Sequence, residues 1–216
     1  MPTIVHASPA DVQAVLANRF DLTVDILGQA ARAGHLMLMF GTDNDAPFIP
    51  GTTGWGRTLR TLRDLTCHKE PWRKDDPGGL SLTINDRRRV AIIVATGNEM
   101  TANPANVQPH TKYPKGAQTA AAVEANAIGD LFPETLSESE RKRPQLPDYA
   151  YWWFLLRFTP SKIFSELSFP HRMEQGWIVE WKVRIILPDI EPDPSKLKFG
   201  ADDFAPDFDP DVRRIG

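Results

Sequence analysis

The uncharged run Val90–Thr96 (VAIIVAT) constrains the fold of this chain more than any other stretch. An uninterrupted series of apolar and β-branched residues is typical of a strand that is buried on both faces, which requires a packing layer on each side. The preceding segment Leu80–Ile84 (LSLTI) alternates apolar and polar residues, and NDRR between the two indicates a turn. We therefore predict a hairpin whose second strand, at about residues 90–96, is central in the sheet.

Two helices are predicted near the N-terminus. Ser8 is a suitable N-cap and Pro9 a suitable first helical residue, so a helix is expected to start there. Asp21 is expected to cap a second helix that stops at Gly34. The segment HLMLMF after this glycine is predicted to be a short strand.

The next segment, residues 41–56, is rich in glycine, proline, aspartate and asparagine and is predicted to be a surface loop. A helix is expected from Gly56 to about Leu65, with leucines on one face and arginines on the other. A further, alanine-rich helix is expected from about Ala117 to Ile128.

Three aromatic and β-branched segments, YWWFLLRF, KIFSELSF and WIVEWKVRIIL, predict a C-terminal antiparallel meander. Side chains alternate along a strand. In the third segment one face is expected to hold Trp177, Val179, Trp181, Val183 and Ile185, and the other Glu180, Lys182 and Arg184.

These elements predict an α+β fold with N-terminal helices and a mixed or antiparallel sheet, in a single domain over residues 1–188. Residues 189–216 carry eight acidic and four basic side chains among prolines and spaced phenylalanines, and are predicted to form an acidic tail. The tail has a net charge of −4, which leaves +1 for residues 1–188 out of a total of −3.

The composition restricts the class of protein. A near-neutral body is not typical of a dedicated nucleic-acid binder. Uncharged apolar stretches fall well short of the roughly 18 residues of a membrane span, and the N-terminal sequence has neither the basic start nor the apolar centre of a signal peptide. A single cysteine, Cys67, fits a reducing compartment. We expect a cytoplasmic protein without a membrane contact.

The stretch GTTGWGR, residues 51–57, is the first candidate for a binding site. Glycines before a helix allow an anion to approach the backbone N–H groups, to which hydroxyls and a guanidinium can be added. The candidate phosphate ligands are Thr52, Thr53, Gly54 and Arg57. The stretch matches neither the Walker nor the dinucleotide pattern. A turn followed by an amphipathic helix is the alternative interpretation.

The second candidate is the loop of about twenty residues after the central strand, residues 97–116. Loops of this length without secondary structure are often functional. Lys112 and Lys115 are candidates for neutralising phosphate, His110 for proton transfer, and Glu99 for metal binding or general base catalysis. A solvated surface loop is the alternative.

The third candidate is formed by Glu166 and the pair Glu180 and Lys182 on predicted neighbouring strands. Metal-dependent nucleases use an acid on one strand and an acid-x-lysine on the next to hold Mg²⁺ and position water. A solvent-exposed face of paired charges is the alternative. The histidines show no metal-ligand spacing, so no other metal site is predicted.

The leading functional hypothesis is a cytosolic accessory or regulatory binding protein without catalysis of its own. It would contact a protein partner, or a complex that contains nucleic acid, through the acidic tail or an aromatic surface. The alternative is phosphate-directed binding of a nucleotide or DNA by residues 51–60 and 97–116, provided that the two segments converge. If the protein is an enzyme, a hydrolase acting on nucleotide or DNA phosphates is expected, and only then is Mg²⁺ implied.

Overall fold

The computed structural model describes residues 3–105, 107–128 and 146–192. Its helices are α1 (Pro9–Phe20), α2 (Val24–Met39), α3 (Ile49–Thr66) and α4 (Ala117–Ile128), with a short 3₁₀ turn at Pro77–Gly79. Its strands are β1 (Ile4–His6), β2 (Trp72–Asp75), β3 (Leu82–Asn85), β4 (Val90–Thr96), β5 (Ala150–Phe158), β6 (Ile163–Glu174) and β7 (Trp177–Ile186). The predicted α+β class is confirmed.

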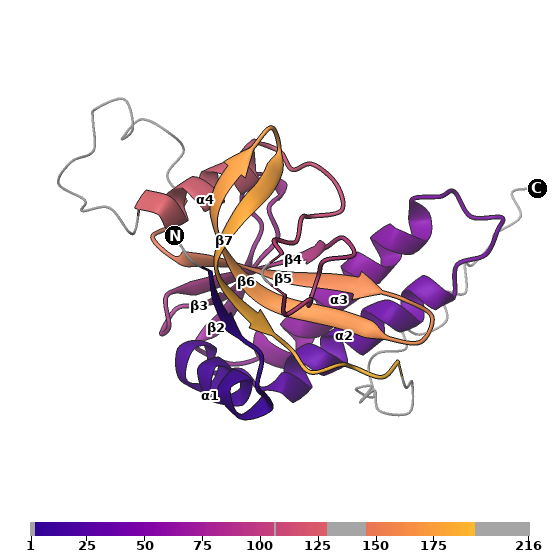
Figure 1. Cartoon of the computed structure of the whole chain (residues 1–216), viewed down its shortest axis with the longest axis horizontal. Helices are drawn as coiled ribbons and strands as arrows, with labels where there is room; N and C mark the ends of the chain where they lie inside the picture. Colours follow the sequence, from indigo (N-terminus) through magenta and orange to yellow (C-terminus); the bar gives the residue numbers. More distant parts are fainter. Residues whose placement is uncertain (1–2, 106, 129–145, 193–216) are drawn as a thin grey trace, which may run out of the picture.

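The seven strands form one mixed sheet in the order β1-β7-β6-β5-β4-β3-β2 (Figure 1). The pairs β1–β7 and β4–β5 are parallel, and the other neighbours are antiparallel. The strands β5, β6 and β7 thus form the antiparallel meander that the sequence predicts. The strand β4 lies inside the sheet, between β3 and β5.

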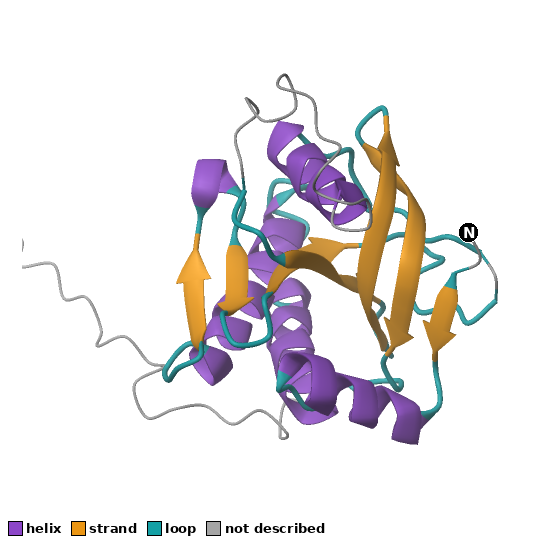
Figure 2. Cartoon of the chain, turned by 90° about the vertical axis from the view of Figure 1, so that its left-hand side faces the viewer, coloured by secondary structure: helices purple, strands orange, loops and turns teal. Residues whose placement is uncertain are grey.

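Both faces of the sheet are covered, which explains the uninterrupted apolar run of β4. Ile92 and Val94 pack with Trp152 on the face that α1, α2 and α3 cover. Ile93 packs with Trp153 on the opposite face, together with residues of α4. Figure 2 shows α4 beside the tall β6–β7 pair and apart from the other helices.

The predicted strand at residues 35–40 is wrong, because α2 continues through Gly34 to Met39. This glycine lies where α2 crosses α3: a Cβ atom there would be 1.9 Å from Thr58 Oγ1 and 2.6 Å from the carbonyl oxygen of Gly54. Asp21 does not cap α2 either. Thr23 is the N-cap, and Asp21 is the left-handed C-cap of α1.

The predicted loop at residues 41–56 is too long, because α3 begins at Ile49 with a proline in its first turn. Thr52 and Thr53 are therefore helical, and their hydroxyls donate to the carbonyl oxygens of Phe48 and Ile49 at 2.9 Å. Gly54 is buried against α2. The threonine hydroxyls of this stretch thus bond within α3, and Gly54 allows α3 to approach α2 closely.

The regular alternation expected along β7 is also wrong. Trp181 packs with the α4 side of the sheet, whereas Val183 and Ile185 pack with the side of α1–α3. The β6–β7 pairing contains register shifts between Phe169 and Met173. Such bulges rotate the following side chains relative to a regular strand.

The folded part of the chain extends past residue 188. Ile190 is buried, and its backbone pairs with that of Ile163. The remainder of the predicted tail, residues 193–216, lies outside the described residues. Within the described ranges no helix combines the length and apolar composition needed to cross a bilayer.

Candidate functional site

A pocket of about 780 Å³ lies between the loop that follows β4 and the β6–β7 hairpin. We call it the loop–hairpin pocket. Its lining consists of Asn98 and residues 110–112 from the loop, and of Glu174, Gln175, Trp177 and Val179 from the hairpin. Two of the predicted site residues, His110 and Lys112, are therefore part of one pocket.

The loop is closed at its base by its own backbone. Asn98 N donates to the carbonyl oxygen of His110 at 2.9 Å, and the Asn98 side chain accepts from His110 N at 3.1 Å. Lys112 N donates to the Thr96 carbonyl at 2.8 Å. The two ends of the loop thus meet at the end of β4, where an anchored framework carries polar side chains.

A buried ion pair fixes the middle of the loop to the sheet. Arg184 Nη2 on β7 lies 2.5 Å from Glu166 Oε2 on β6, and the two residues are 1% and 0% exposed. Glu166 also accepts from Ala102 N, and Arg184 donates to the carbonyl oxygens of Asn103 and Val107. Each buried charge is thereby satisfied by the loop as well as by its partner.

A second set of contacts fixes the loop just before the pocket. Trp181 Nε1 donates to the Pro109 carbonyl at 2.7 Å, and Trp181 N donates to Gln108 Oε1 at 3.2 Å. Gln108 Nε2 in turn donates to Thr3 Oγ1. His110 consequently follows a segment that is held against β7 on both sides of the Gln108–Pro109 bond.

The pocket combines an aromatic wall with polar and cationic groups. His110 Nδ1 lies 3.0 Å from the Ile178 carbonyl, which can only accept, so Nδ1 carries a hydrogen and Nε2 remains for other contacts. The His110 and Trp177 rings meet edge-on at 6.5 Å. Lys112 is exposed, 5.6 Å above the Tyr113 ring, and forms no ion pair with any described residue.

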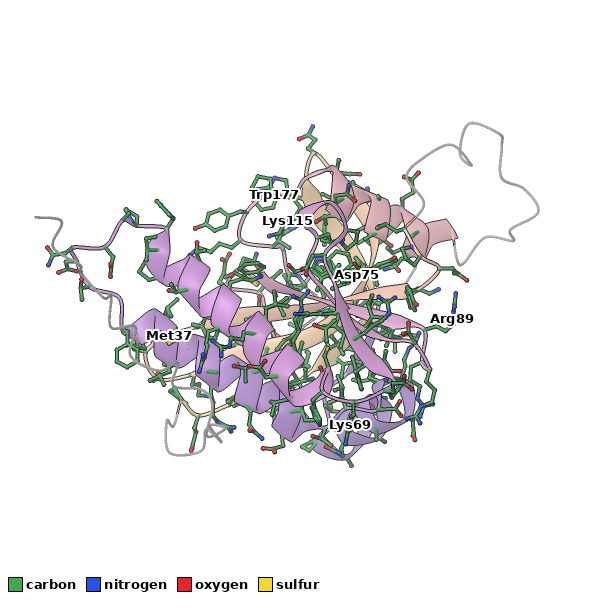
Figure 3. The ribbon with its side chains drawn as sticks, turned by 180° about the vertical axis from the view of Figure 1, so that it is seen from behind. Met37, Lys69, Asp75, Arg89, Lys115 and Trp177 are labelled. Atoms are coloured by element: carbon green, nitrogen blue, oxygen red, sulfur yellow. The ribbon has the colours of Figure 1, made fainter. Side chains whose placement is uncertain are left out.

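A second pocket of about 470 Å³ adjoins the first. We call it the helix–hairpin pocket. It is lined by residues 115–117, Ala120, Val123 and Glu124 on the side of α4, and by residues 171–173, 175 and 176 of the hairpin. Lys115 N donates to the Gly176 carbonyl at 2.7 Å, and burial lowers the pKa of the Lys115 ammonium. Lys115 and Trp177 lie next to each other in Figure 3.

Residues 51–57 do not join these pockets. Gly56 lines a different pocket of about 650 Å³ with Arg60 and other residues of α3 and β2, and no residue of the loop takes part in it. The hydroxyls of Thr52 and Thr53 are bonded within α3. Phosphate binding by residues 51–57 would require them to meet the long loop. None of these three pockets is lined by both segments. Arg57 stands on α3, outside their linings.

Glu166 and Glu180 do not form a common metal site. Glu166 lies opposite Ile186, whereas Glu180 lies opposite Arg172, six residues along β6 or about 20 Å in an extended strand. A 3.1 Å hydrogen bond from Arg172 lowers the pKa of the Glu180 carboxyl. Lys182 is two residues from Glu180, and Glu99 is exposed outside the pocket linings. Among the described residues no group of three potential metal ligands occurs.

Two important residues were missed by sequence reasoning. Trp177 was expected on the same face of the strand as Trp181, but it is half-buried and lines the loop–hairpin pocket. Arg184 was expected on a charged face, but it is buried and holds the loop. The signal for Trp177 was its place directly after Gln175–Gly176, because a residue at a hairpin turn is seldom buried on all sides.

Comparison of the chain with protein-family models, curated proteins and solved structures gives no significant match.

Proposed function

We propose that this protein is an accessory binding protein that holds an anionic ligand with a planar ring, of the nucleotide type, in the loop–hairpin pocket. The observation that carries the proposal is the presence in the same pocket of Trp177 and of Lys112, which forms no ion pair within the described part of the chain. In this proposal the protein has no catalysis of its own. Nucleotides combine a π-face and a phosphate, which are the two features that such a pair of side chains recognises.

The chemistry of the lining supports a ligand of this kind. Stacking of a base on an aromatic side chain contributes about 1–3 kcal/mol per base. Lys112 provides a point charge for a phosphate, and the Asn98 amide and His110 add hydrogen-bonding groups. The acid in the lining, Glu174, is already paired with Arg172. The volume of about 780 Å³ falls within the range of small-molecule sites.

The anchoring of the loop supports the same proposal. The pocket wall that carries His110 and Lys112 follows directly on the contacts of Trp181 with residues 108 and 109. A wall that is already ordered loses less conformational entropy when a ligand binds. The buried pair of Glu166 and Arg184 gives the loop this order without taking part in binding.

Quenching of tryptophan fluorescence by nucleotides tests the proposal. Thymidine monophosphate and a short oligo(dT) should quench the signal of Trp177, and Trp177→Leu should remove the quenching. Lys112→Gln should weaken binding at least fivefold, because one phosphate contact is lost. Lys69→Gln, an exposed lysine far from the pocket in Figure 3, is the matched control and should bind like the wild type. Unquenched fluorescence with both ligands would refute the proposal.

A second candidate function, contact with a protein partner, is favoured by the exposed apolar residues at the connection of α2 and α3. Phe40 and Phe48 are 67% and 66% exposed, and Met39 and Ile49 lie beside them in the sequence. We call these four residues the α2–α3 tip. Figure 1 shows this connection projecting from one side of the molecule. Clustered apolar side chains of this size are typical of protein contact sites.

The charge around the α2–α3 tip specifies the kind of partner. Residues 36–56 contain no lysine or arginine, and Asp43 and Asp45 lie in the connection itself. The complementary partner is therefore a protein with an apolar groove rimmed by lysine or arginine. A photoreactive phenylalanine analogue placed at position 40 or 48 should crosslink to such a surface, with crosslinks mapped by mass spectrometry. The same crosslinks from position 69 would contradict this function.

A further inference from the structure

The ammonium group of Lys115 has no acceptor among the described residues. It is half-buried in the helix–hairpin pocket and forms no hydrogen bond or ion pair with any described residue. A cation that is partly removed from water without an acceptor is destabilising, and a bound anion would supply the missing acceptor. Burial also lowers the pKa of this ammonium, in agreement with its partial removal from water.

Besides Lys115, the ionisable side chains that line the helix–hairpin pocket are one arginine, one histidine and one glutamate. Arg172 from β6 is engaged by Glu174 and Glu180, and His171 from β6 and Glu124 from α4 complete the ionisable lining. The first turn of α4 contains no acidic residue, and its N-terminal end borders the pocket. The partial positive charge of that helix end adds to the attraction that Lys115 exerts on an anion.

The two pockets are neighbours on one continuous surface. Gln175 lines both of them, and the backbone hydrogen bond from Lys115 to Gly176 joins their common wall. Trp177 is the next residue after Gly176 and faces the loop–hairpin pocket. A ligand that stacks on Trp177 can therefore continue past this wall towards Lys115.

We propose that Lys115 forms a second phosphate subsite, so that the ligand is a single-stranded nucleic acid of two or more nucleotides rather than a free mononucleotide. This inference rests on the proposed function of the loop–hairpin pocket. One base stacks on Trp177, Lys112 contacts its phosphate, and the phosphate of the adjoining nucleotide reaches Lys115. Each further phosphate contact adds affinity that depends on salt concentration.

The test is a length series of oligo(dT) from one to eight nucleotides, measured by fluorescence titration with the full chain, with oligo(rU) in parallel to compare the sugar. The affinity of the wild type should rise at least tenfold between the mononucleotide and the tetranucleotide. Lys115→Gln should reduce this gain to less than threefold and leave mononucleotide binding unchanged. The plot of log affinity against log salt has a negative slope, and the variant should make this slope less steep by about 0.7, the value for one contact to a single strand.

Lys115→Arg is the conservative variant and should keep most of the gain, because it retains the charge. Thermal unfolding of both variants verifies that they are folded, and Lys69→Gln is again the matched control. A Lys115→Gln variant with the length dependence and salt slope of the wild type would overturn the subsite. Absence of quenching by every oligonucleotide would instead overturn the proposed function itself, so the two failures are distinguishable.

Discussion

Glu166 and Arg184 form an ion pair of 2.5 Å between β6 and β7, and both side chains also bind the backbone of the loop above them. The pair therefore has two structural roles, one within the sheet and one in ordering the wall of the loop–hairpin pocket. Its charges are removed from water almost completely. Removing one partner of this buried pair should therefore cost more stability than breaking an ion pair at the surface.

We predict that Glu166→Gln lowers the free energy of unfolding by about 3–5 kcal/mol, because it leaves the guanidinium of Arg184 buried without its counter-charge. Urea denaturation at neutral pH measures the loss. Glu180→Gln is the matched control: the pair of Glu180 with Arg172 is solvent-exposed, and its loss should cost less than about 1 kcal/mol. The double variant Glu166→Leu with Arg184→Met should be more stable than the sum of the single losses implies. Equal losses for Glu166→Gln and Glu180→Gln would contradict the role of the buried pair.

The crossing of α2 and α3 yields a second prediction. Gly34→Ala should destabilise the fold by about 1–3 kcal/mol, because the new methyl group meets the backbone oxygen of Gly54, which cannot move away as a flexible side chain could. Gly56→Ala in α3 is the control. A Cβ atom there meets nothing within 4 Å, so the change should stabilise the helix by up to about 1 kcal/mol. Thermal unfolding compares the two, and a neutral Gly34→Ala variant would show that the helices can separate freely.

The same crossing explains why part of the helical layer could not be predicted from the sequence. Gly34 resembles a helix stop, and HLMLMF after it has the apolar character of a strand. Only the contact with α3 reveals that the glycine serves close packing within a continuing helix. By contrast, β4, the meander and α4 follow from local patterns that agree with their tertiary setting, and these were predicted correctly.

The candidate site, like the helical layer, could be predicted from the sequence only in part. The length and polarity of the loop indicated His110 and Lys112, which do share a pocket. Trp177 was placed on one face with Trp181, and Arg184 on the other with Glu180, because a strict two-residue alternation cannot anticipate the register shifts of the β6–β7 pair. Likewise, the ion pair of Glu166 depends on strand register, which is a non-local property.

Tyr151 gives a prediction for alkaline pH. Burial raises the pKa of its phenol to about 12, and its hydroxyl donates to the Pro147 carbonyl at 2.7 Å. In the unfolded chain a tyrosine ionises near pH 10. The unfolded state thus releases this proton first, and the stability of the wild type should fall between about pH 10 and pH 12. Tyr151→Phe should lack this component, so the difference in melting temperature between wild type and variant should shrink over this range. A constant difference would contradict the prediction.

Asp21 gives the corresponding prediction for acid. Hydrogen bonds from Arg88, followed by those from Arg87 and Asn85, hold the pKa of its carboxyl well below the ordinary value. In the unfolded chain an aspartate titrates near pH 4. The stability that Asp21 contributes is therefore fully present above pH 4 and is lost as the pH falls below it, because the unfolded state takes up the proton first.

Asp21→Asn isolates this effect. Asparagine tolerates the left-handed backbone of Asp21, with φ of 57°, and retains one oxygen acceptor, so the change removes the charge with little strain. The variant should melt at a lower temperature than the wild type at pH 7, and the gap should narrow steadily below pH 4. Arg89→Gln, whose ion pair with Asp148 is exposed, is the control and should melt close to the wild type at both pH values. If the gap between wild type and Asp21→Asn stayed the same at pH 7 and pH 2, the charge of Asp21 would not be the stabilising feature of this corner of the fold.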